Sequence, residues 1–81
     1  MFKNTYNGRN NICGLKIKEL RTAATPKLSQ RALADKMQLE GIDLNKNAIQ
    51  KIESGARFVT DIEIYAFARL FNVTVDYLLT E

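Results

Sequence analysis

One short pattern occurs four times in this chain and constrains its fold more than any other feature. An apolar residue precedes a Ser, Thr or Asn, and a second apolar residue follows four positions after that polar residue. The polar side chain can accept from a free backbone N–H in the first turn of a helix, while the two apolar side chains pack across that turn. Four helix starts are therefore predicted, at Leu28-Ser29 with Leu33, Leu44-Asn45 with Ile49, Val59-Thr60 with Ile64, and Val73-Thr74 with Leu78.

A fifth helix is expected ahead of these four. From about Ile12, apolar residues recur at i, i+4, i+7 and i+11, the spacing of one helical face. Thr25-Pro26 ends this helix, because proline disfavours helical geometry in the residue before it. No strand pattern interrupts the series, so we predict an all-α fold, a compact five-helix bundle. The stripe of the first helix consists of Cys13, Ile17, Leu20 and Ala24.

The 81 residues allow one small domain. Residues 1–11 hold four asparagines and little periodicity, so we expect a loose N-terminal arm followed by a domain over residues 12–81. One cysteine and no histidine argue against a zinc site, and we expect no metal and no cofactor. No apolar run is long enough for a membrane span or a signal peptide, which leads us to expect a cytoplasmic protein with no membrane association.

The third predicted helix carries the most informative surface. Gly55 can end it in the left-handed conformation, and its outward face has amides and ammonium groups but no acid. Such a face matches the donor and acceptor edges of base pairs in the DNA major groove. An ordinary solvated helix face explains the same residues equally well. The face consists of Asn47, Gln50, Lys51 and Ser54.

Charge is distributed unevenly along the chain. Residues 1–51 contain ten Lys or Arg against four Asp or Glu, whereas residues 52–81 contain two against five. This asymmetry favours one basic face that binds a polyanion. At the second helix start, Gln30 occupies the first helical position between Lys27 and Arg31, where free N–H groups attract an anion such as phosphate.

Taken together, several motifs resemble the phage repressor/Cro helix-turn-helix family of transcriptional regulators. They are Leu28-Ser29-Gln30, Leu33-Ala34-Asp35-Lys36-Met37, the segment Ile49-Gln50-Lys51-Ile52-Glu53-Ser54-Gly55, and Val73-Thr74-Val75-Asp76-Tyr77-Leu78-Leu79. The resemblance covers about Cys13 to Leu79.

This resemblance implies roles for individual residues. Gln30 would bind phosphate, Arg57 would meet the DNA backbone or minor groove, and Arg21 would form a salt bridge with Glu53. Val75 and Tyr77 would meet across a dimer interface. The residues at or beside base edges would be Asn45, Lys46, Asn47, Gln50 and Lys51.

The chain departs from the family between Met37 and Ile49, where several residues replace a tight turn. We expect an extra turn on the second helix that ends at Gly41, followed by a lengthened connection. In that connection Ile42 and Leu44 would pack inward, and the loop would bulge away from DNA.

These features predict a sequence-specific DNA-binding transcriptional regulator, a repressor that binds double-stranded DNA as a weak homodimer on a palindromic operator. The alternative is a protein-interaction module of the same fold, such as an antitoxin-like or antirepressor partner. An enzyme is not expected, because the chain lacks histidine, a glycine-rich phosphate loop and a paired nucleophile and base. The alternative would use an apolar patch outside the core stripe of the fourth helix: Ile62, Tyr65, Ala66 and Leu70.

Overall fold

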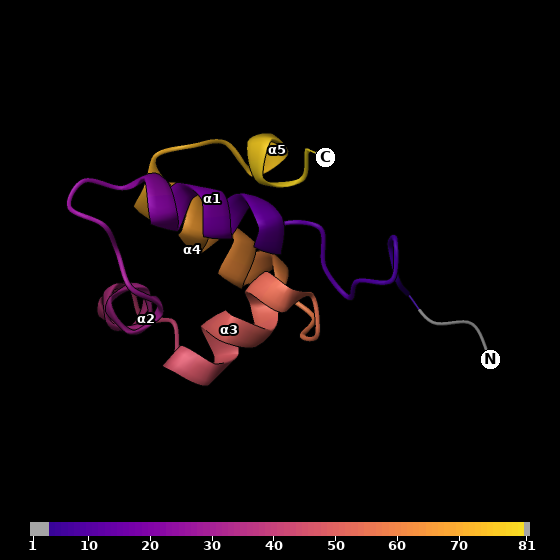
Figure 1. Cartoon of the computed structure of the whole chain (residues 1–81), viewed down its shortest axis with the longest axis horizontal. Helices are drawn as coiled ribbons and strands as arrows, with labels where there is room; N and C mark the ends of the chain where they lie inside the picture. Colours follow the sequence, from indigo (N-terminus) through magenta and orange to yellow (C-terminus); the bar gives the residue numbers. More distant parts are fainter. Residues whose placement is uncertain (1–3, 81) are drawn as a thin grey trace.

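Five helices form the protein, as Figure 1 shows for the computed structural model, which describes residues 4–80. Within that range the only strand-like pairing is an isolated bridge between Tyr6 and Arg9. The predicted all-α bundle is confirmed. The helices are α1 (Gly14–Ala23), α2 (Gln30–Leu39), α3 (Lys46–Ser54), α4 (Asp61–Phe71) and α5 (Val75–Leu78).

The four predicted helix starts are confirmed by their capping hydrogen bonds. In each case the cap oxygen accepts from the backbone N–H three residues on, at distances of 2.8 to 3.2 Å. The start of α4 has a second capping hydrogen bond, in which the Glu63 carboxylate accepts from the Thr60 N–H at 3.0 Å. Local sequence therefore fixes where four of the five helices begin. The caps are Ser29, Asn45, Thr60 and Thr74.

The core joins all five helices. α3 packs against α1 and α2, and α4 packs against α2 and α5. α4 packs against two helices, so the face that it buries is wider than a single row of apolar side chains. Ala66, which we expected in the exposed patch, is therefore buried, whereas Ile64 and Phe71 are only half-buried. The largest fully buried side chains are Ile17, Leu33, Met37, Leu44, Ile49, Ile52, Phe67 and Leu78.

The connection between α2 and α3 is closed by backbone geometry. Gly41 has a φ of +83°, its N–H donates to the Gln38 carbonyl at 3.0 Å, and the Ile42 N–H donates to the Met37 carbonyl at 3.0 Å. This pair of bonds is the Schellman arrangement for ending a helix. The inward packing is confirmed, since Leu44 is buried and Ile42 is half-buried. Gln38 Nε2 donates to the Leu44 carbonyl at 3.0 Å and holds the loop against α2.

The segment before α1 differs from our expectation of a loose arm. Tyr6 and Arg9 exchange backbone hydrogen bonds of 2.8 and 2.9 Å around Asn7-Gly8, and both turn residues have positive φ. Residues 9–11 are hydrogen-bonded to the end of α3 and the loop after it. The expectation is therefore wrong for residues 9–11. Residues 1–3 of the expected arm, and the last residue of the expected domain, lie outside the described range.

Candidate nucleic-acid interface

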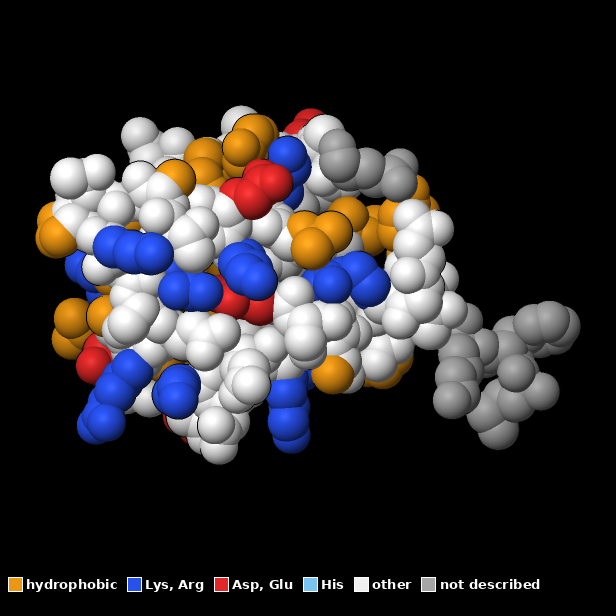
Figure 2. Space-filling model, in the orientation of Figure 1, with side chains coloured by type: hydrophobic (Ala, Val, Ile, Leu, Met, Phe, Trp, Pro, Cys, Tyr) orange, Lys and Arg blue, Asp and Glu red, His pale blue; other side chains and the backbone are white. Residues whose placement is uncertain are grey.

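The outward face of α3 is a row of exposed polar side chains. Lys46 and Asn47 lie in its first turn, and Gln50 and Lys51 lie one turn later. Within residues 4–80 these four side chains form no hydrogen bond or ion pair, so their donors and acceptors face solvent. Figure 2 shows Lys and Arg side chains standing out along the lower edge of the molecule, the edge where Figure 1 places α3.

Predicted residues from α2 and α3 meet in a shallow groove. Arg31 from α2 lines this groove together with Asn45 and Lys46 at the start of α3. Asp35 also lines it and offsets part of the positive charge. The Asn45 side chain already has one hydrogen-bond partner within the protein, because its Oδ1 accepts from the Ala48 N–H at 2.8 Å. Its amide nitrogen is the part of the side chain that remains available to a ligand.

At the start of α2, two exposed cations lie beside a glutamine whose side-chain amide is hydrogen-bonded within the protein. Lys27 and Arg31 are exposed and Gln30 is half-buried. Gln30 Nε2 donates to Glu53 Oε1 at 3.0 Å. One of the two N–H bonds of this amide is therefore used within the fold, and one is left for the phosphate contact that we predicted.

Glu53 connects three helices from the inner side of α3. Arg21 binds it with two hydrogen bonds, from Nε to Oε2 at 2.6 Å and from Nη2 to Oε1 at 2.9 Å. The salt bridge implied by the family resemblance is present, and the hydrogen bond that Arg21 donates to the Glu53 carboxylate raises the pKa of Arg21. Arg21 Nη1 also donates to the Leu28 carbonyl at 3.0 Å. These bonds fix how the start of α2 crosses α3.

Arg57 has an intramolecular partner that sequence reasoning missed. Its Nη1 and Nη2 donate to the two carboxylate oxygens of Glu63 at 2.9 and 3.0 Å, and Nη1 also donates to the Phe58 carbonyl. Hydrogen bonding from Arg57 lowers the pKa of Glu63. The guanidinium that we predicted to contact DNA is thus hydrogen-bonded to the first turn of α4. The same Glu63 carboxylate accepts from the Thr60 N–H, so one side chain joins the loop after α3 to the start of α4.

The two predicted dimer residues differ in exposure. Val75 is half-buried and packs against the core, whereas Tyr77 is 40% exposed. The Lys16 ammonium lies 5.1 Å from the centre of the Tyr77 ring, over its face. Of these two residues, only Tyr77 therefore offers a large exposed apolar surface.

Comparison with known families agrees with this geometry. A family model described as Helix-turn-helix matches residues 17–78, from within α1 to the end of α5. The chain belongs to the repressor/Cro-type helix-turn-helix family. This helix-turn-helix protein therefore carries a DNA-binding domain, with α2 and α3 as the two helices that give the family its name. No curated protein and no solved structure matches the chain.

Three further observations describe this helix-turn-helix protein. Among its described residues, no helix is both long and apolar enough to cross a membrane. Over the same residues, no group of three or more His, Cys, Asp or Glu side chains is arranged to hold a metal ion. Burial raises the pKa of the Cys13 thiol to about 11, so this thiol is protonated near neutral pH and serves as a small core residue.

Proposed function

We propose that this helix-turn-helix protein is a sequence-specific transcriptional regulator that acts as a repressor and reads the DNA major groove with α3. The observation that carries the proposal is the exposed, acid-free row of amides and ammonium groups on that helix. Asn47 can donate to and accept from adenine, and Lys46 or Lys51 can donate to guanine. The start of this row lies beside Arg31 of α2, which can bind phosphate.

Phosphate contacts would set the register of the protein on the duplex. Lys27 and Arg31 are free to make them, and Gln30 can use its remaining N–H. Arg57 would be a secondary backbone contact, because its guanidinium is shared with Glu63. Two copies paired through Tyr77 and Val75 would bind a palindromic operator, with half-sites about one helical turn apart.

The test begins by selecting duplexes that bind from a random library. Lys51→Ala and Asn47→Ala are then measured on the selected duplex and on random DNA. Each substitution should cost about 1–3 kcal/mol on the selected duplex and much less on random DNA, because a base contact is lost. Lys36→Ala is the matched control, since Lys36 is exposed and lines a pocket with Arg69 and Leu70 of α4. Equal losses on both DNAs would contradict base reading by that residue.

A second candidate is a partner-binding module that makes no specific DNA contact. Ile62 and Tyr65 are exposed by 67 and 59% and lie three residues apart on α4, and Phe58, in the loop before that helix, is exposed by 57%. Exposed apolar side chains at this spacing are typical of a protein-interaction surface. The same selection separates the two functions. A module of this kind would enrich no sequence over random DNA, whereas a DNA reader enriches one.

A further inference from the structure

We infer that Arg9 and Asn11 are positioning residues for DNA recognition. They hold the C-terminal end of α3 and so set the angle at which its exposed face meets DNA. The inference rests on the proposed function of α3. Both residues precede the part of the chain that matches the helix-turn-helix family, residues 17–78.

Arg9 donates to two carbonyls in the last turn of α3, of which that of Ile52 also accepts from the Gly55 N–H. Its Nη2 donates to the Glu53 carbonyl at 2.8 Å and to the Ile52 carbonyl at 3.3 Å. The last four carbonyls of a helix have no partner within that helix, and the negative end of the helix dipole attracts a cation. Arg9 supplies both the donors and the charge. Its Nε donates to the Asn11 carbonyl at 3.3 Å, so the guanidinium is already engaged within the chain.

Asn11 joins the end of α3 to the start of α1. Its Nδ2 donates to the Ile52 carbonyl at 3.0 Å and to the Arg57 carbonyl at 2.8 Å. Its Oδ1 accepts from the Gly14 N–H, the first of α1, at 2.8 Å. One side-chain amide therefore ties together α1, α3 and the loop that leads to α4.

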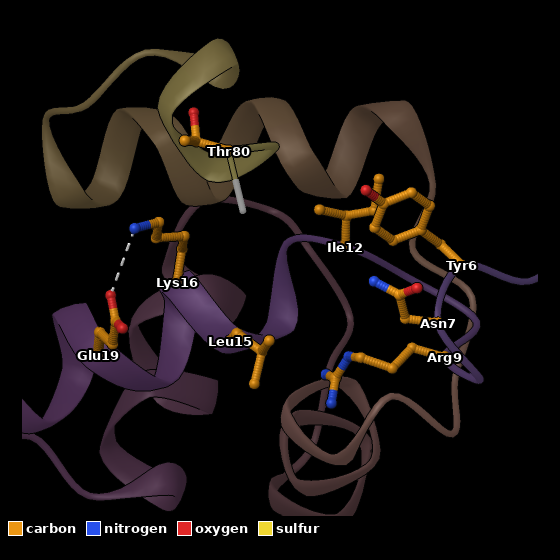
Figure 3. A pocket seen from close by; sticks show the side chains of 8 residues that line it. All are labelled: Tyr6, Asn7, Arg9, Ile12, Leu15, Lys16, Glu19 and Thr80. Carbon is orange, nitrogen blue, oxygen red and sulfur yellow. Dashed lines mark ion pairs between the residues drawn. The ribbon is translucent and has the colours of Figure 1, made fainter.

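Asn10 and the turn before it keep Arg9 in place. The Asn10 N–H donates to the Gly55 carbonyl at 2.7 Å, and its Nδ2 donates to the Ala56 carbonyl at 3.0 Å. On the other side of Arg9, the Asn7-Gly8 turn closes the bridge to Tyr6. Figure 3 shows Arg9 at the edge of a pocket that is also lined by Tyr6, Asn7 and Ile12.

Two glycines make this close contact possible. The Arg9 side chain lies across Gly55, where an added Cβ would stand 2.8 Å from Arg9 Cζ. An added Cβ on Gly14 would overlap the Ile52 carbonyl oxygen. The start of α1, the Arg9 side chain and the end of α3 are thus packed with no room for a methyl group. A substitution at Arg9 should therefore shift the end of α3.

The held end of α3 lies opposite the end that would enter DNA. α3 has nine residues, a length of about 13 Å, with Lys46 and Asn47 in its first turn. A small tilt about the held end displaces these side chains from the base edges. Because hydrogen bonds to bases require the contacting groups to be placed within about 0.5 Å, such a tilt lowers specific binding more than phosphate binding.

The experiment measures Arg9→Ala and Arg9→Lys on the selected duplex and on random DNA across a range of salt concentrations. Measurements are made at a temperature where circular dichroism shows each variant to be folded. We expect both variants to lose about five- to tenfold on the selected duplex, with little change on random DNA and an unchanged salt slope. Lysine keeps the charge but cannot reproduce the planar fork of arginine, so it should not rescue binding. If Arg9→Ala does not fold, Arg9→Lys carries the test alone.

Two control variants test whether the effect of Arg9 differs from the loss of a phosphate contact and from a general loosening of the core. Arg31→Ala, at a proposed phosphate contact, should reduce the salt slope by about one unit. Ile64→Val loosens the core at α4 and should leave the ratio of selected to random binding unchanged.

The inference is overturned if Arg9→Lys restores selected binding, if Arg9→Ala reduces the salt slope, or if selected binding does not change in either variant. A parent protein that binds selected and random DNA equally would instead overturn the proposed function.

Discussion

At the scale of single residues, the most consequential side chain is a buried acid. Glu53 is the one charged residue that is buried among residues 4–80, and it lies on the inner side of α3, the helix that presents the proposed base-reading face. Burying a carboxylate is costly unless hydrogen bonds and an opposite charge replace its water. Arg21 and Gln30 supply these partners, and no buried side-chain oxygen or nitrogen in the described range lacks a hydrogen bond.

Glu53→Ala should therefore destabilise the protein by up to about 3–5 kcal/mol, because it leaves the half-buried Arg21 guanidinium without its carboxylate partner. Urea unfolding followed by circular dichroism measures the loss. Glu19→Ala is the control, since the pair that Glu19 forms with Lys16 is 3.6 Å long and the Glu19 side chain is 67% exposed. This control should cost at most about 1 kcal/mol. Similar losses in the two variants would show that the Arg21–Glu53 pair contributes no more than a surface pair.

At the scale of elements, the loop between α3 and α4 is held by the first turn of α4. The Glu63 carboxylate accepts from two groups on Arg57 and from the Thr60 N–H. The hydrogen bond from Arg57 is the largest cause of its lowered pKa. Asn11 donates to the backbone carbonyl of the same Arg57. The loop is thus held by hydrogen bonds to Glu63 of α4 and to Asn11, which fixes the end of α3 relative to α4.

The lowered pKa of Glu63 predicts how stability changes with acid. Because the folded protein holds this proton less tightly than the unfolded chain, the contribution of Glu63 is complete above the ordinary glutamate value of 4.5. It is lost as pH falls through the lowered folded value. The free energy of unfolding of Glu63→Gln should therefore differ most from that of the parent near neutral pH, and the two should converge in acid. Urea titrations from pH 7 to about pH 2 test this, within the range over which paired carboxylates protonate.

Arg57→Ala provides the reciprocal variant for this pH dependence. It removes the donor responsible for the lowered pKa, so its stability curve should flatten in acid as that of Glu63→Gln does. A curve that stays as steep as that of the parent in both variants would assign the acid sensitivity to other carboxylates.

At the scale of the whole molecule, the proposed DNA surface combines side chains from two helices. The cations at the start of α2 and those on α3 come from the basic part of the chain, residues 1–51. Three of the five acids after residue 51 lie on α4 and α5, and Glu53 and Glu63 are paired with arginines inside the protein. This distribution favours approach of a polyanion from the side of α2 and α3.

Removing a cation at the start of α2 should weaken binding almost equally on all sequences. For Lys27→Ala and for Arg31→Ala, the slope of log affinity against log salt should shrink by about one unit, because one phosphate contact is lost. Fluorescence anisotropy on selected and random duplexes provides the measurement. A slope equal to that of the parent would remove the residue from the phosphate interface.

Assembly on DNA is the second property of the whole molecule that can be tested. A single domain of this size makes few base contacts, so high specificity favours two copies on a two-fold operator. Tyr77→Asp should leave the fold intact, since the ring is 40% exposed, but should abolish the cooperative loading of a second copy. Sedimentation on full and half sites decides this. Cooperative loading by the variant would move the interface elsewhere, with exposed Ile62 and Tyr65 as the next surface to mutate.

The amino-acid sequence by itself determined the features that depend on neighbouring residues. A cap such as Asn45 accepts from an N–H three residues away, and Gly55 takes a φ of +88° just after α3. Both requirements are met within one turn, so the helix boundaries and the outward face of α3 could be predicted without the fold. The Asn7-Gly8 turn was equally local, because Asn-Gly favours positive φ at both positions, and it could have been predicted from the same kind of reasoning.

Only the tertiary structure decided which distant groups meet. Arg9 and Asn11 bind carbonyls more than forty residues away, and the Gln30 amide reaches Glu53 across 23 positions. Such partners depend on where the packed helices leave open carbonyls and a buried carboxylate, which no local pattern encodes. The burial of Ala66 has the same origin, since it follows from the packing of α4 against both α2 and α5. Local hydrogen bonds thus set the helices and the exposed face of α3, while long-range packing set the groups that hold that face in place.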